Sequence, residues 1–150
     1  MTNRKTLFME TTVKPTRTSI NDIMALLVDS NASNIAMTYE DRKITGITFV
    51  YQVGKGQLAF ALPIRVEPIF NVLQTDRKRH PDKYIAEDRA KAERIAWRQL
   101  LRWLEAQLVM IDLGMVAMHE VFMPYQLDNS GRTMFQVFES QRLLGPGDQK

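Results

Sequence analysis

The sequence predicts an α+β fold in which a three-stranded antiparallel meander and a C-terminal hairpin pack against one long amphipathic helix and two shorter helices. Two observations carry this prediction. Between residues 35 and 66, apolar side chains recur at every second position in three successive segments, which is the period of strands with one buried face. Between residues 82 and 113 the apolar residues lie alternately four and three positions apart, which is the period of a helix. A sheet covered by helices on one face satisfies both patterns.

Composition limits the organisation of the chain. With 150 residues, of which 45% are hydrophobic and 25% charged, it has ordinary globular composition and supports one core. We expect an arm or edge strand over residues 1–18, a single domain over 19–144 and a disordered tail over 145–150. The net charge of +3 permits contact with nucleic acid or anionic surfaces without requiring it.

Several classes of protein are excluded by what the chain lacks. It has no cysteine, so disulfides, thiolate metal sites and cysteine nucleophiles are absent. The N-terminus has no apolar signal segment, and no stretch approaches the roughly 18 apolar residues of a membrane span. The sequence therefore predicts a soluble, cytoplasmic protein without membrane contact.

The first predicted element is a short helix. Ser19 is placed as its N-cap, with Asp22 three residues on, and apolar residues at helical spacing continue to about Asp29. Turn-forming residues follow at positions 29–34, and the period then changes from 3.6 to 2.

The three predicted strands are joined by short turns. Residues 40–43 separate the first pair and residues 54–56 the second, and both segments suit hairpins. Pro63 indicates that the third strand lies at an edge or ends there. The alternating apolar residues are Ile35, Met37 and Tyr39, then Ile47, Phe49, Tyr51 and Val53, then Leu58, Phe60, Leu62, Ile64 and Val66.

The second half is predicted to be a short helix, a long helix and a hairpin. The short helix begins near Glu67, and the long helix covers about residues 82–113, with Gly114 as its C-terminal cap. Strands are expected over residues 120–126 and 133–138, with an edge or bend at Pro124.

The long helix carries an apolar seam. We expect this seam to cover the apolar face of the sheet, and pairing with the same helix in a homodimer is the alternative. Its members are Trp97, Leu101, Leu104, Leu108 and Ile111.

Another face of the same helix carries a row of arginines. Arg94, Arg98 and Arg102 follow one another at four-residue steps, where like charges weaken an isolated helix by roughly 0.2–0.5 kcal/mol per pair. Glu105 can reach Arg102, whereas Arg98 has no carboxylate three or four residues away. Such a row is either a solvated face, a set of tertiary ion pairs, or a surface that binds phosphates or an acidic partner.

Further residues could extend a cationic surface. Lys91 lies one turn before the row and also suits a pair with Glu87. Trp103 or Tyr84 could provide a stacking surface, although a peripheral core position for Trp103 is the alternative. The connector before the helix supplies a second basic patch, formed by Arg77, Lys78 and Arg79 with His80.

No catalytic constellation is found. The pair His119-Glu120 begins like a zinc-protease motif, but the required second histidine position is Met123. Residues 54–56 lack the spacing of a phosphate-binding loop. Asp41 and Lys43 do not supply the clustered carboxylates with a lysine that a metal-dependent nuclease needs. We therefore expect a protein that is not an enzyme and that needs no metal or cofactor.

The segment Arg94-Ile95-Ala96-Trp97-Arg98, with residues 104–107 and 120–125, resembles small uncharacterised proteins of bacteriophages and mobile genetic elements. The resemblance covers residues 89–125 and assigns no activity to any of them. It implies a setting in DNA replication or recombination, or in blocking a host protein, inside the host cell.

Two functions are consistent with these features. The first is an accessory protein that binds nucleic acid, DNA rather than RNA, through the arginines. The second is a module or inhibitor that docks an acidic host protein through the same arginines or through apolar residues such as Trp103 and Phe122.

Overall fold

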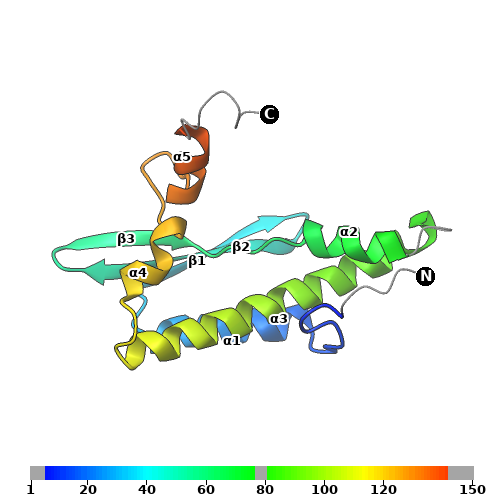
Figure 1. The fold of residues 1–150 in the computed structure, drawn as a ribbon, viewed down its shortest axis with the longest axis horizontal. Coiled ribbons are helices and arrows are strands. Elements are labelled where there is room, and N and C mark those ends of the chain that lie inside the picture. Colours follow the sequence, from blue (N-terminus) through cyan, green and yellow to red (C-terminus); the bar gives the residue numbers. More distant parts are fainter. Residues whose placement is uncertain (1–5, 77–80, 142–150) are drawn as a thin grey trace.

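The computed structural model describes residues 6–76 and 81–141 and shows the predicted α+β fold (Figure 1). A three-stranded sheet lies over two long helices, and three further helices flank it. The elements are α1 (Thr16–Asp29), β1 (Asn34–Glu40), β2 (Lys43–Val53), β3 (Gly56–Ala61), α2 (Glu67–Asp76), the 3₁₀ helix η1 (Pro81–Tyr84), α3 (Ile85–Asp112), α4 (Met118–Phe122), the 3₁₀ helix η2 (Met123–Tyr125) and α5 (Met134–Gln141).

The sheet is the predicted antiparallel meander in the order β1-β2-β3. The first hairpin turns at Asp41 and Arg42, whose φ angles of 48° and 66° are those of a two-residue turn that matches the strand twist. The second hairpin turns at Gly54, with φ of 60°. Strand β3 ends at Ala61, before Pro63, because proline cannot donate to a ladder.

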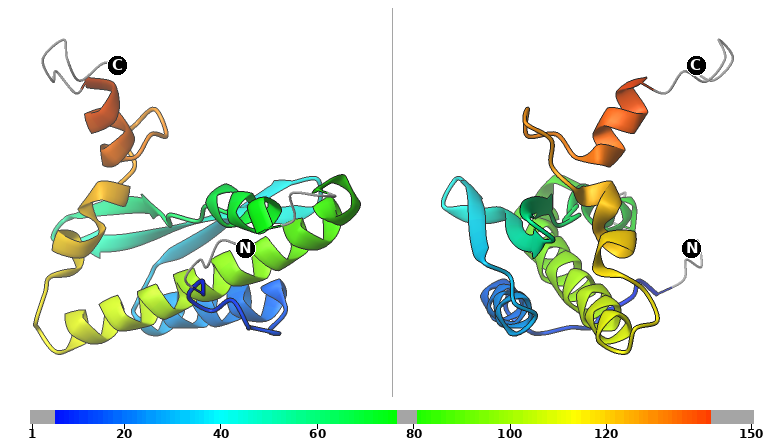
Figure 2. Two further views of the ribbon diagram at one scale, coloured as in Figure 1. Left: turned by 45° about the vertical axis from the view of Figure 1, so that its right-hand side comes forward. Right: turned by 90° about the vertical axis from the view of Figure 1, so that its left-hand side faces the viewer.

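The main core lies between one face of the sheet and the helices α1 and α3, which run under that face (Figures 1 and 2). The seam of α3 packs there as predicted, with Trp97 and Leu104 fully buried against Phe49 and Phe60. The rings of Phe49 and Phe60 stack with centroids 5.4 Å apart across the β2–β3 pair. The heptad-spaced residues therefore form an intramolecular core.

A second, smaller core joins α2 to the N-terminal half of α3. Ile69 and Leu73 of α2 are buried with Ile95 of α3, and Leu7 of the N-terminal arm packs against them. Ala92 and Ile95 are fully buried there, so α2 extends the buried part of α3 beyond the end of the sheet (Figure 1).

Helix α3 ends at the predicted glycine. Gly114 has φ of 76°, and its N–H donates to the Ile111 carbonyl at 3.0 Å. The N–H of Met115 donates to the Met110 carbonyl at 2.9 Å, which completes a Schellman motif.

The predicted C-terminal hairpin is wrong. The segment forms α4, η2 and α5, and its β-structure is limited to the single bridges Phe60↔Gln126 and Leu127↔Thr133 within the described residues. The Glu120 carboxylate accepts the N–H of Ala117 at 3.1 Å and starts α4. Phe122 then packs in the main core. Its burial favours a helical turn in this segment, where the alternation of apolar residues alone predicts a strand.

The start of the chain also differs from the prediction. Helix α1 begins at Thr16, and Ser19 is buried inside it instead of capping it. Residues 6–15, the described part of the arm, contain turns and no strand. The predicted tail over 145–150 lies outside the described residues.

Hydrogen bonds hold the segment before α5. Leu127 N–H donates to the Ala59 carbonyl at 2.8 Å, which fixes the segment to the edge of β3. One oxygen of Asp128 then accepts the N–H and hydroxyl of Ser130, at 2.8 and 2.6 Å, and the N–H of Arg132 at 3.0 Å. The Asp128 turn, residues 128–132, is therefore organised around one carboxylate.

We predict that this turn weakens in acid. The Ser130 hydrogen bond, followed by those from the backbone, lowers the pKa of Asp128 below 3.8. A lowered pKa in the folded state means that the stabilisation is complete above the unfolded pKa and is lost as pH falls through the folded pKa. Amide exchange of Ser130 and Arg132 followed by NMR should show protection in wild type that begins to fall below the unperturbed pKa of 3.8 and is lost as the pH passes the lower pKa of the folded state. Asp128→Asn should lack this transition, and an Asp128 pKa at or above 3.8 would contradict the prediction.

Candidate nucleic-acid interface

The three arginines of the row share one face of α3 but have different environments. Arg94 is half-buried, Arg98 is only 4% exposed, and Arg102 is exposed and pairs with Glu105 at 2.8 Å. The structure therefore does not present them as one continuous exposed row.

Arg98 is buried and reaches Asp22 of α1, while the N-terminal arm meets α3 at the next residue. The neighbouring Gln99 donates from Nε2 to the Phe8 carbonyl at 2.7 Å, which holds the arm across the helix. Within the described residues, Arg98 has an ion pair with Asp22 of α1 at 3.8 Å, while its Nε and Nη2 atoms have no hydrogen-bond partner. Of the alternatives that the sequence leaves open, the structure shows a tertiary ion pair for this residue.

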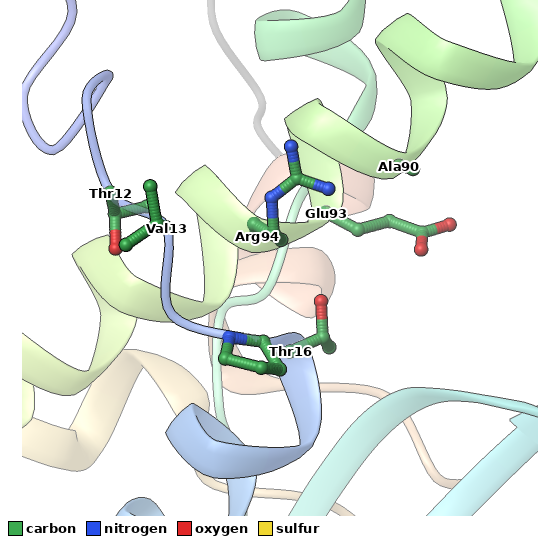
Figure 3. A pocket seen from close by; sticks show the side chains of 7 residues that line it. Thr12, Val13, Thr16, Ala90, Glu93 and Arg94 are labelled. Carbon is green, nitrogen blue, oxygen red and sulfur yellow. The ribbon is translucent and has the colours of Figure 1, made fainter.

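Arg94 lies in a hollow between α3, the arm and the start of α1 (Figure 3). The hollow has a volume of about 500 Å³, and we call it the Arg94 hollow. The guanidinium group projects between the arm and α3 on the open side of the hollow. The lining residues are Thr12, Val13, Pro15, Thr16, Ala90, Glu93 and Arg94.

The positive charge of Arg94 is not neutralised by its neighbour. Glu93 also lines the hollow, but its carboxylate points away from Arg94 (Figure 3) and pairs with Lys43 Nζ at 3.3 Å. Among the described parts of the chain, Arg94 has no ion pair. The β1–β2 hairpin thus removes the acidic group that would otherwise compete for this arginine.

The start of α1 adds to the positive potential of the hollow. Pro15 occupies the N-cap position and supplies no side-chain acceptor, and the first turn contains no acidic residue. The amide N–H groups of a first helical turn lack intrahelical partners and carry a partial positive charge. Thr12 and Thr16 also line the hollow, and the Thr16 hydroxyl points toward α3 (Figure 3), so the hollow offers a hydroxyl donor and a cation to an anion of phosphate size.

Sequence reasoning missed the α1 side of this site. The signal was present in the order Pro15-Thr16-Arg17, a helix start with a proline and no acid. The signal was overlooked because the predicted helix began at Ser19. That α1 starts beside Arg94 depends on tertiary packing, which the periodicity of neither helix reveals.

Lys91 lies on α3 near the Arg94 hollow but does not line it, and the second basic patch is not placed. Lys91 is half-buried, three residues before Arg94, and it has no ion pair within the described residues. Arg77, Lys78 and Arg79 lie outside the described residues.

Trp103 is partly buried and lies at the edge of the main core. Its ring meets Phe122 at 5.9 Å and Tyr125 at 5.8 Å, with interplanar angles of 89° and 85°. It also lines a hollow of about 300 Å³ with Tyr125 and the exposed Arg65. Because the Trp103 and Tyr125 rings are perpendicular, they cannot sandwich a base between them, and the contacts of Trp103 are those of a packing residue.

The described residues contain no group of three His, Asp or Glu side chains that could hold a metal ion. Among the same residues, no helix combines the length and the apolar character needed to cross a membrane.

No protein-family model matches the chain, and comparison with curated proteins and with solved structures gives no significant match either.

Proposed function

We propose that the protein is a non-enzymatic accessory protein that binds nucleic acid, with DNA as the expected ligand before RNA, by placing backbone phosphates at the Arg94 hollow. The observation that carries this proposal is the unpaired charge of Arg94 in the Arg94 hollow. The carboxylate that also lines the hollow, that of Glu93, forms an ion pair with Lys43 instead. We further propose the setting that the sequence resemblance implies, association with a phage or mobile element.

The chemistry of the hollow suits a phosphate. An arginine fork matches two phosphate oxygens, and threonine hydroxyls and helix N-terminal amides are common phosphate donors. Lys91, with the exposed Lys14 and Arg17 near the start of α1, adds charge around the hollow. These groups carry no information about base identity, so the proposal is for binding with little sequence preference.

The proposal is tested by fluorescence-anisotropy titration of single-stranded DNA, duplex DNA and RNA of equal length over a range of salt concentrations. Wild type should bind DNA with an affinity that falls steeply with salt. The double variant Arg94→Ala/Lys91→Ala should weaken duplex binding by roughly tenfold or more at low salt. The slope of log affinity against log salt should become shallower by about 0.9 for each phosphate that the variant no longer binds.

Arg102→Ala is the matched control, because Arg102 lies on the same face of α3 and is already neutralised by Glu105. It should change the affinity less than Arg94→Ala does. Unchanged binding by the folded double variant would remove the Arg94 hollow from the site. Absence of binding to any of the three nucleic acids would favour the alternative, an acidic host protein as the partner of the same cations.

A further inference from the structure

One face of the sheet is left open by the helices. The helices α1 and α3 cover the face that carries Phe49 and Phe60, and α5 stands on the opposite side of the sheet (Figures 1 and 2). The strand register places the other side chains together on what we call the outer face. Its residues are Asn34, Ala36, Thr38 and Glu40 of β1, Lys43, Gly46, Thr48, Val50 and Gln52 of β2, and Gln57, Ala59 and Ala61 of β3.

The outer face has an unusual composition for a surface in contact with water. All three strands are described, and the only charged residues of this face are Glu40 and Lys43, which pair at one end of the sheet, although a quarter of the chain is charged. Solvent-facing strands normally carry lysine and other charged residues, which discourage association. The cross-strand neighbours Ala36, Thr48 and Ala61 are small, so another element can approach the backbone closely.

Helix α5 presents the complementary surface. None of its residues is buried: Met134 and Phe135 are each 42% exposed, and Phe138 is 62% exposed. Phe138 lies three residues after Phe135 and four after Met134, so the three side chains form one apolar patch. The described residues leave 42% to 62% of each of these three side chains exposed.

Local hydrogen bonds nevertheless stabilise α5 before any partner covers its patch. The Thr133 hydroxyl accepts the N–H of Gln136 at 3.1 Å, and the Gln136 side chain accepts the N–H of Thr133 at 2.9 Å, which is a reciprocal capping box. The Asp128 turn fixes the segment before it. Because isolated helices shorter than about 12–15 residues are marginal in water, an eight-residue helix with nothing buried gains stability when its apolar patch is covered.

We propose that the protein forms a two-fold symmetric homodimer in which α5 of each copy packs its Met134, Phe135 and Phe138 patch on the outer face of the other. The outer face and α5 lie on the same side of the molecule, opposite to α1 and α3, so two copies meeting on this side bring each α5 to the sheet of the other copy (Figures 1 and 2). A two-fold contact requires a self-complementary surface, and one chain here supplies both parts.

The chemistry and the size of the contact favour a second copy as the partner. Apart from Glu40 and Lys43 at one end of the sheet, both surfaces are uncharged, so neither attracts a strongly charged partner, and little charge is removed from water when they meet. A fully buried phenylalanine removes about 150–250 Å² from water. Covering the exposed parts of two phenylalanines and one methionine on each copy, together with the matching sheet area, buries roughly 1,000 Å², which reaches the lower limit for a specific interface.

The test measures mass by light scattering after size-exclusion chromatography of the full chain at several concentrations. Wild type should have twice the 17.4 kDa mass of the chain. Phe138→Glu in the patch and Thr48→Lys on the outer face should each be monomeric, with circular dichroism spectra like that of wild type. Leu113→Glu is the matched control, because Leu113 is 71% exposed and lies outside both surfaces, and this variant should remain dimeric.

Mixing the two monomeric variants provides the decisive measurement. In the mixed dimer, the glutamate introduced at position 138 of one copy would meet the lysine introduced at position 48 of the other. The second pair of surfaces stays wild type, so the dimer mass should return.

Three results would overturn the proposal. The first is a monomeric wild type at all concentrations, including the case in which α5 closes on the sheet of its own chain. The second is a Phe138→Glu variant that stays dimeric, and the third is a mixture of the two variants that stays monomeric. Since mass requires no nucleic acid, the result is independent of the proposed function.

Discussion

Replacing Trp97 by alanine is expected to lower the free energy of unfolding by about 3–5 kcal/mol, which corresponds to a fall in melting temperature of roughly 10 °C. Trp97 is 1% exposed and lies in the main core between α3 and the sheet. Its removal leaves a large cavity because α1 and the strands around it are themselves tightly buried. Urea denaturation followed by circular dichroism measures the change.

Val109→Ala is the control for this substitution. Val109 is on the same helix but is 56% exposed, so its truncation should change the free energy of unfolding by no more than about 0.5 kcal/mol. If Trp97→Ala cost less than about 1 kcal/mol, the packing of α3 across the sheet would be incorrect.

Replacing Arg98 by methionine is expected to stabilise the fold, by about 1 kcal/mol or more. Arg98 is buried with two unpartnered nitrogen atoms, and its one ion pair is long, at 3.8 Å. Methionine keeps most of the apolar stem without the cost of burying a charge. Asp22 is 53% exposed, so water can solvate it when the arginine is gone.

Arg98→Ala separates packing from charge at this position. It should destabilise the protein by roughly 1–3 kcal/mol, since it removes the stem and leaves a cavity. Urea denaturation compares the two variants. A lower free energy of unfolding for Arg98→Met than for wild type would show that the buried charge stabilises the fold. Because Arg98 is enclosed, Arg98→Met should also bind DNA as wild type does. A stable Arg98→Met variant that no longer binds would place this residue in the site.

The parts of the fold that the sequence predicted well are those with long, regular patterns. The β1–β3 meander and α3 follow from strict periods of 2 and of alternating four and three residues, and Gly114 marks the end of α3 because only glycine readily takes its backbone angle. In these elements the conformational preference of the local sequence and the burial of its apolar residues favour the same secondary structure.

The C-terminal segment shows where the pattern failed. Val121, Met123 and Tyr125 alternate as in a strand, but the segment is too short for its period to separate strand from helix. The capping box of Thr133 and Gln136 was the better signal, because it depends on spacing three residues apart and not on alternation.

The candidate site was predicted in part. The face of α3 that carries Arg94 could be read from the four-residue spacing, but the difference between Arg94 and Arg98 could not. It depends on Asp22, on the arm and on Lys43, which are far from the arginines in the sequence. Charge patterns within one helix contain no information about such partners.

The irregular register of β1 has a consequence for how the protein behaves in concentrated solution. Strand β1 is an edge of the sheet, and its pairing with β2 shifts between Thr38 and Tyr39. This irregularity bends the edge and interrupts its row of free backbone donors and acceptors, and Glu40 adds a charge at the end of the strand. At the other edge, Leu127 occupies the Ala59 carbonyl of β3. Neither edge therefore offers a long regular template, and we expect the protein to resist strand-by-strand polymerisation into fibrils.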